Sequence, residues 1–190
     1  MIQLKHLPLD DISISSPYGA RSITVNGRYY WWHNGLDLKA QLNTPVYAVA
    51  DGEVMAARYD NSYGYYIAID HGKFGTLYAH LSHYKVTEGS IVKSGEIIGH
   101  TGSTGDTTGP HLHFEIRLGS YANFWERAHC DRSVFMNTID PMLFIEDFFN
   151  KKDNLSVDEA AKIVQSAAGL EDKTMDYIVK HYRFGDDLVK

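Results

Sequence analysis

The run Gly109-Pro110-His111-Leu112-His113-Phe114-Glu115 constrains the fold more than any other part of the chain. It has the composition of a β-strand, in which successive side chains alternate between the two faces of a sheet, so His111 and His113 would project from one face. Two imidazoles on one face can serve one metal ion and its bound water. Alone the motif is weak, because ten histidines in 190 residues give about half of one chance His-x-His. Whether His111 and His113 belong to a metal site therefore depends on further ligand residues elsewhere in the chain.

One upstream segment, His33-Asn34-Gly35-Leu36-Asp37, offers a histidine and a carboxylate in a His-x-x-x-Asp spacing. The segment His6-Leu7-Pro8-Leu9-Asp10 has the same spacing, so spacing does not separate the two. Context does, because Asp37 lies in an alternating apolar run that is typical of a strand, whereas the other pair is interrupted by Pro8. We therefore favour His33 and Asp37.

Three blocks in a fixed order resemble the lysostaphin-type family of zinc metallopeptidases, the M23 or LytM-like group. They are His33-x-x-x-Asp37, Tyr78-Ala79-His80-Leu81 and the run that ends at Glu115. The resemblance covers roughly residues 14–145. It extends to the segments Ser16-Pro17-Tyr18-Gly19, Thr44-Pro45-Val46-Tyr47-Ala48, Asp51-Gly52-Glu53-Val54 and Gly89 to Gly99.

The resemblance implies that His33, Asp37 and His113 are zinc ligands and that His80 and His111 are catalytic. Two imidazoles and one carboxylate leave a fourth position for water, as a catalytic zinc site requires. Zinc would bring the pKa of that water to about 7 and polarise a peptide carbonyl. One catalytic histidine would take the proton and the other would stabilise the oxyanion or protonate the leaving amine, and the sequence leaves this division open. Glu115 is expected to orient an imidazole.

Other residues are weaker site candidates. His71 is expected at a surface turn, and His83 could touch substrate. Family members often carry a tyrosine that assists at the metal, and three tyrosines qualify here without a way to choose among them: Tyr18, Tyr29 and Tyr30.

Composition excludes several classes of protein. The net charge of −6 and the absence of a basic run argue against nucleic-acid binding. A single cysteine, Cys130, cannot form an intramolecular disulfide and is expected to be a buried or loop thiol rather than a nucleophile. No apolar run approaches the roughly 18 residues that span a bilayer, and the amino terminus does not resemble a signal peptide. We therefore expect synthesis without a leader and action at the bacterial cell wall, as a phage-associated lysin or virion component.

Residues 12–118 favour a mainly β fold, a compact antiparallel sheet or barrel-like peptidase domain. The expected strands are bounded by turn residues and lie at 46–50, 52–57, 65–69, 76–80, 97–100 and 112–117. The stretch from Gly89 to Gly99 also resembles half of a lipoyl or biotinyl carrier domain, but Lys93 does not sit in a modification motif. A carrier is therefore the weaker interpretation.

The chain is expected to divide into a peptidase domain at 1–149 and a helical tail at 150–190. Residues 119–139 form an insertion, which either walls the groove or is a packing excursion. The tail would begin with a polar linker at 151–154, and the capping box Ser156-Val157-Asp158-Glu159 would start its first helix.

The predicted function is zinc-dependent hydrolysis of peptide bonds in peptidoglycan cross-links or stem peptides, with peptidoglycan and phage tail proteins as partners. A degenerate domain that only activates other wall enzymes is disfavoured, because such domains lose ligands. The alternative from another class is a non-enzymatic phage tail or wall-binding module.

Overall fold

The computed structural model describes residues 2–124 and 135–153. The chain divides into one unit at Met1–Phe148 and a second at Phe149–Lys190. Cys130 and residues 154–190, which include the expected tail helices, lie outside the described residues. The helical tail therefore stays a prediction, and the account below concerns the first unit and the helix that ends it.

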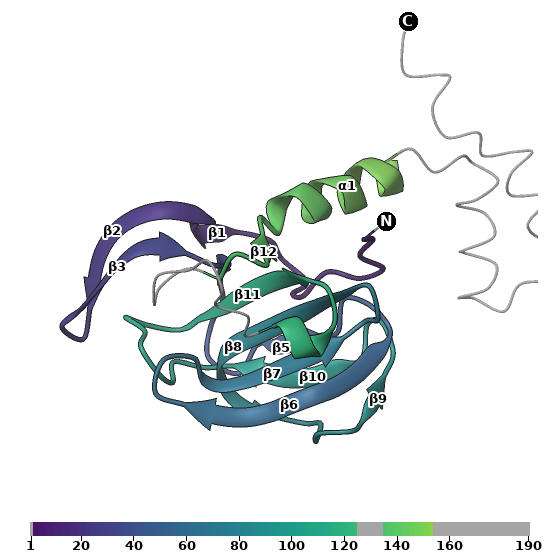
Figure 1. Cartoon of the computed structure of the whole chain (residues 1–190), viewed down its shortest axis with the longest axis horizontal. Helices are drawn as coiled ribbons and strands as arrows, with labels where there is room; N and C mark the ends of the chain where they lie inside the picture. Colours follow the sequence, from purple (N-terminus) through teal and green to yellow (C-terminus); the bar gives the residue numbers. More distant parts are fainter. Residues whose placement is uncertain (1, 125–134, 154–190) are drawn as a thin grey trace, which may run out of the picture. The chain divides into compact units, whose positions relative to one another are not determined.

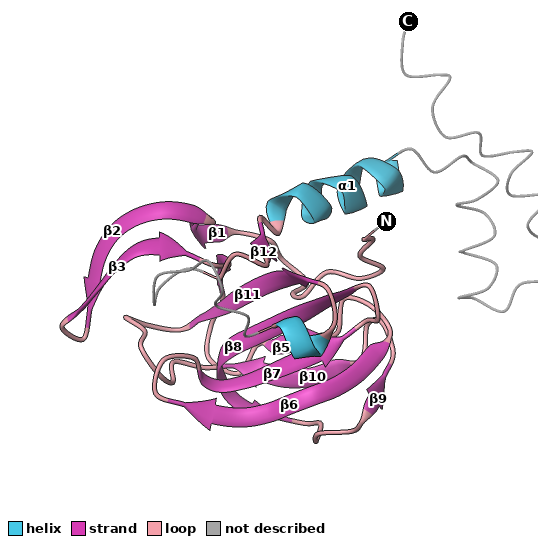
Figure 2. Cartoon of the chain, viewed as in Figure 1, coloured by secondary structure: helices cyan, strands magenta, loops and turns pink. Residues whose placement is uncertain are grey.

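The unit is built on antiparallel strands, which confirms the mainly β prediction (Figures 1 and 2). In chain order the strands are β1 (Ile14–Ser16), β2 (Gly19–Val25), β3 (Arg28–His33), β4 (Leu36–Lys39), β5 (Pro45–Tyr47), β6 (Gly52–Asp60), β7 (Gly64–Asp70), β8 (Phe74–Tyr84), β9 (Ile91–Val92), β10 (Ile97–Thr101), β11 (His111–Leu118) and β12 (Thr138–Ile139). The main sheet has the order β1-β4-β11-β8-β7-β6-β9, β10 pairs with β5 and β8, and β12 pairs with β11.

Side chains of β11 alternate between two different environments. Leu112, Phe114 and Ile116 are fully buried in the main hydrophobic core. The opposite face of the sheet carries the alternate side chains His111, His113, Glu115 and Arg117. The expected alternation is thus confirmed, and it places both histidines of the motif on one face.

The main core is closed by segments from both ends of the unit. Leu4, Leu7 and Leu9 of the amino-terminal segment pack into it, as does Ile145 of helix α1 (Met142–Asp153). The helix begins after an Asp-Pro pair in which Asp140 Oδ1 accepts a hydrogen bond from the Met142 amide at 2.9 Å. It continues through residues 151–153, which the sequence analysis assigned to a linker.

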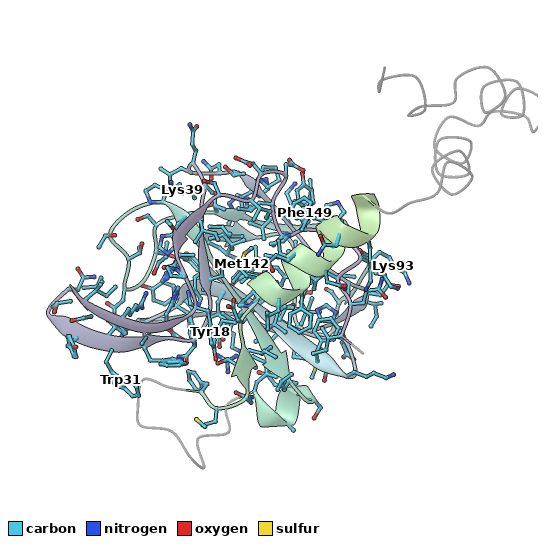
Figure 3. The ribbon with its side chains drawn as sticks, turned by 90° about the horizontal axis from the view of Figure 1, so that it is seen from above. Tyr18, Trp31, Lys39, Lys93, Met142 and Phe149 are labelled. Atoms are coloured by element: carbon cyan, nitrogen blue, oxygen red, sulfur yellow. The ribbon has the colours of Figure 1, made fainter. Side chains whose placement is uncertain are left out.

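Strands β2 and β3 form a separate two-stranded sheet that projects from the main sheet (Figure 1). Its turn is Asn26-Gly27, whose φ angles of 50° and 78° fit the type I′ turn that tight hairpins favour. Trp31 lies on this hairpin, and Met142 marks the start of α1 (Figure 3). The hairpin leads directly into His33, so it delivers the first expected zinc ligand.

Candidate metal centre

Three potential ligand atoms converge at the end of the hairpin. His33 Nε2 lies 3.1 Å from Asp37 Oδ1 and 3.0 Å from His113 Nδ1, and the last two atoms are 2.9 Å apart. Ligand atoms bound 2.0–2.2 Å from one tetrahedral zinc ion lie about 3.3 Å apart. The trio is thus arranged as the sequence predicted, and its two imidazoles and one carboxylate fit zinc.

Sheet register brings the trio together. Asp37 on β4 pairs directly with His113 on β11, so the two side chains are cross-strand neighbours on the same face. The turn between β3 and β4 passes so close to β11 that a Cβ atom at Gly35 would fall 2.6 Å from the Phe114 carbonyl oxygen. Only glycine permits this approach, which places His33 beside the other two ligands.

Hydrogen bonds fix each ligand imidazole in the tautomer that a metal needs. His33 Nδ1 donates to the Pro17 carbonyl at 2.8 Å, which leaves a lone pair on Nε2. His113 Nε2 donates to Glu115 Oε1 at 2.9 Å, so Nδ1 is the nitrogen that faces Asp37 and His33 and that a metal would bind in exchange for its proton. The expected role of Glu115, orienting an imidazole, agrees with this contact.

Glu115 belongs to a buried polar network below His113. Arg117, which is fully buried, donates from Nε to Glu115 Oε2 at 2.6 Å and from Nη1 to the Phe124 carbonyl. The Tyr63 hydroxyl donates to Glu115 Oε1 at 2.8 Å. Burial would raise the pKa of Glu115, but Arg117 and His113 outweigh it and lower that pKa to about 2. The carboxylate therefore stays ionised beneath the ligands.

The pKa values of the expected ligands depend on one another. Burial opposes ionisation of Asp37, yet hydrogen bonds from His111, His113 and His33 hold its pKa well below the ordinary range. Burial likewise opposes protonation of His113, but Asp37 and Glu115 raise its pKa to about 9. In the metal-free protein a proton therefore occupies the position where a cation is expected.

The two expected catalytic histidines flank the ligands. His80 and His111 have ring centroids 4.7 Å apart, and His111 Nε2 lies 3.5 Å from Asp37 Oδ1. His80 Nδ1 donates to the Thr104 carbonyl at 2.8 Å, and His111 Nδ1 donates to the Gly109 carbonyl at 2.9 Å. Both rings are therefore held by the loop before β11 through Nδ1.

His80 occupies an unusual backbone conformation. Its φ is 59°, in the left-handed region that non-glycine residues rarely adopt. Such strain costs on the order of 1–3 kcal/mol and is concentrated at functional sites. Burial, together with repulsion from His113 and His111, lowers the pKa of this imidazole to about 3, so it is neutral at physiological pH.

An open cleft of about 830 Å³ lies over these groups. It is lined by all five expected site residues, by Glu115 and by aromatic side chains of the hairpin. The lining also includes Phe135, which lies within the 119–139 insertion, so at least that residue of the insertion helps to wall the groove. Residues 125–134 lie outside the described part of the chain.

The weaker candidates differ in whether they line the cleft. Tyr29 and Tyr30 line the cleft, whereas Tyr18 instead donates a hydrogen bond to the Thr138 carbonyl. His83 is exposed and stacks on His100 outside the cleft lining, and His71 is half-buried and bonds Asp51 and Thr76.

Sequence reasoning did not single out four cleft or network residues: Arg21, Tyr63, Asp106 and Arg117. None of them lies in a motif block, and only the folded arrangement brings them to the site. For Arg117 one signal was present, because strand alternation from His113 continues through Glu115 to Arg117 on the same face.

Comparison with known proteins gives a consistent picture. The model of peptidase family M23 matches residues 32–124. Peptidoglycan DD-endopeptidase ShyA of Vibrio cholerae is 45% identical over 104 residues, which are 54% of this chain and 24% of the relative. The catalytic domain of lysostaphin from Staphylococcus simulans superposes with a TM-score of 0.61 and 32% identity, over 75% of this chain and 99% of that domain.

A zinc-containing peptidase from Vibrio cholerae superposes with a TM-score of 0.56 and 36% identity, over 62% of this chain and 37% of the other. The chain spans about a quarter of the length of the curated relatives it matches, 26% and 24% in two of them. Among the described residues, no helix is long and apolar enough to cross a membrane.

Proposed function

The chain belongs to peptidase family M23, and from that premise we propose that it is a zinc-dependent endopeptidase that hydrolyses peptide bonds of bacterial peptidoglycan. The observation that carries the proposal is the convergence of His33 Nε2, Asp37 Oδ1 and His113 Nδ1 within 3.1 Å of one another beneath an open cleft. The DD-endopeptidase activity in the name of the Vibrio relative supports the substrate class.

Zinc held by His33, Asp37 and His113 would supply Lewis acidity and an acidic bound water. His80 is neutral, and its Nδ1–H is used by Thr104, so its Nε2 lone pair can accept a hydrogen bond from water in the cleft. His111 is held in the same way, with its Nδ1–H on the Gly109 carbonyl, so both rings present Nε2 to the cleft, where one can accept the proton of the water and the other can serve the oxyanion or the leaving amine. Glu115 holds His113 in the ligating tautomer.

Digestion of purified peptidoglycan tests the proposal. Zinc-loaded protein should release peptide fragments that mass spectrometry identifies, and both chelated protein and Asp37→Ala should release none. His6→Ala is the matched control, because His6 has the same spacing to Asp10 but lies outside the trio, and it should digest normally. An intact wall after treatment with zinc-loaded protein would favour the alternative, a non-enzymatic wall-binding module.

The finer parts of the prediction, which are association with a phage and contact with phage tail proteins, are proposed on the sequence alone. Mass spectrometry of purified phage particles from the source organism checks them. Absence of the protein from such particles would remove the virion from the proposal without affecting the peptidase.

A further inference from the structure

Arg21 lines the same cleft from strand β2. Its Nη1 lies 3.8 Å from Asp37 Oδ2, beyond hydrogen-bond distance, and its guanidinium sits 5.4 Å from the centroid of the Tyr30 ring. The side chain is 20% exposed. Among the described residues, 2–124 and 135–153, its buried Nε has no hydrogen-bond partner. This buried N–H is a donor that an entering acceptor can engage only when the side chain turns toward the cleft.

The other charged groups of the cleft are engaged within the protein. Arg28 donates to Asp106 Oδ2 at 2.6 Å, and Glu115 is bound by the buried Arg117. Asp60 Oδ1 accepts hydrogen bonds from the backbone amides of residues 62 and 63. The neighbour of Arg21 is Asp37, whose carboxylate is expected to bind the metal. This ion pair is long, and a divalent cation on Asp37 Oδ1 would compete with Arg21 for the charge of the same carboxylate, so the guanidinium is the cation of the described cleft that is held least tightly.

We propose that Arg21 binds a substrate carboxylate next to the scissile bond. This inference rests on the proposed function and names the bond that the site prefers. A planar guanidinium pairs with a carboxylate through two parallel hydrogen bonds. Because the guanidinium lies 3.8 Å from an expected metal ligand, a carboxylate held there is close to the reacting amide.

The chemistry of wall peptides makes this contact selective. In a DD bond the residue that supplies the scissile nitrogen carries a free carboxylate on the carbon attached to that nitrogen. Inside a glycine bridge the same carbon carries another amide, which offers no charge to Arg21. The site should therefore prefer DD-type bonds over bonds within glycine bridges.

Two matched peptides test the inference. They share one scissile bond, and the residue after it ends in a free carboxylate in one peptide and in a carboxamide in the other. The zinc-loaded parent should cleave the free acid with a kcat/KM at least about tenfold higher, as loss of one charge-assisted pair predicts. Arg21→Gln should bring this ratio close to one, and Arg21→Lys should restore part of it. Arg28→Gln is the matched control, because Arg28 is paired with Asp106, and it should keep the parental ratio.

Failures of the two proposals are distinguishable. Equal rates on both peptides by the parent overturn the role of Arg21 and leave the peptidase intact. An Arg21→Gln variant that slows both peptides equally, or that loses zinc by elemental analysis, shows instead that Arg21 only orients Asp37. If the parent digests peptidoglycan but neither peptide, the bonds cut in the digest decide, and cleavage confined to bonds without an adjacent carboxylate overturns the inference. No digestion of any substrate contradicts the proposed function itself.

Discussion

At the scale of single residues, the proposed metal ligands and the proposed catalytic histidines are different side chains with different hydrogen-bond partners. Nδ1 of His80 and Nδ1 of His111 donate to loop carbonyls, and neither residue belongs to the converging trio. We expect His80→Ala and His111→Ala each to keep zinc near the parental level while hydrolysis falls by at least about 10². Elemental analysis and peptide kinetics on the same samples check both. Normal turnover in either variant would remove that residue from the catalytic set.

Glu115 connects the metal site to the interior. Replacing it with glutamine keeps an acceptor for His113 but leaves the buried Arg117 without a carboxylate. Unpairing a buried charge costs about 3–5 kcal/mol, and disturbing a residue that orients a ligand weakens metal affinity about 10–100-fold. Urea unfolding and competition with a chelator measure the two effects. If the variant keeps the parental free energy of unfolding and the parental zinc affinity, the contacts of Glu115 with His113 and Arg117 contribute to neither.

The pH dependence of metal binding follows from His113. Its pKa in the metal-free protein is raised to about 9, so near neutral pH zinc must displace a proton from this imidazole. Burial lowers the pKa of His33, which is then already neutral. As pH falls from 8 to 6, apparent zinc affinity should therefore fall about tenfold per unit. Calorimetry in buffers of different ionisation enthalpy should detect about one released proton per zinc.

A control for this titration is His83→Gln, because His83 stacks on His100 outside the cleft lining and should leave the slope unchanged. A zinc affinity that is flat between pH 8 and 6 would contradict the protonation of His113.

At the scale of elements, the sequence predicted those strands in which buried and less buried side chains alternate. Leu36 and Leu38 on β4 are fully buried, so the alternation that placed Asp37 on the opposite face was visible in the sequence. Strand β2 has few buried positions because its hairpin stands outside the main sheet, and its sequence carries no such period. The left-handed φ of His80 was equally hidden, because histidine is enriched in that region but most histidines do not adopt it.

Helix α1 was missed for a different reason. Asp140 and Pro141 form a normal start signal, but the charged residues at 151–153 look like a linker when considered alone. Packing of Ile145 and Phe148 against the core stabilises the helix beyond what its local composition indicates.

Gly35 controls the approach of the β3–β4 turn to β11. A Cβ atom there would fall 2.6 Å from the Phe114 carbonyl and 2.8 Å from His113 Cε1. Gly35→Ala must therefore displace one ligand or the strand behind it, at a cost of about 1–3 kcal/mol and with weaker zinc binding. Gly109→Ala is the control, since a Cβ atom at Gly109 meets nothing within 4 Å. Equal zinc affinities for the two variants would disprove the steric argument.

At the scale of the whole molecule, the trio and its two flanking histidines could be predicted because each lies in a motif block along the chain. Arg21, Tyr63 and Arg117 could not, since their roles depend on contacts between β2, the β6–β7 turn and β11. The sequence therefore indicates the metal and the reaction. The groups that orient the ligands and face the substrate depend on the fold.

The boundary of the catalytic unit gives the last prediction. Every expected ligand and catalytic histidine precedes residue 114, so a chain that ends at Asp153 should fold, bind zinc and cleave soluble peptidoglycan fragments at the parental rate. A chain that ends at Asp147 lacks the second half of α1, including Phe148, which packs against the main core. This shorter chain should therefore unfold at a lower temperature than the chain that ends at Asp153. Thermal unfolding and kinetics on the two shortened chains check this difference. If the chain ending at Asp153 is insoluble or loses zinc, residues 154–190 are required by the peptidase unit and the predicted two-part organisation is wrong.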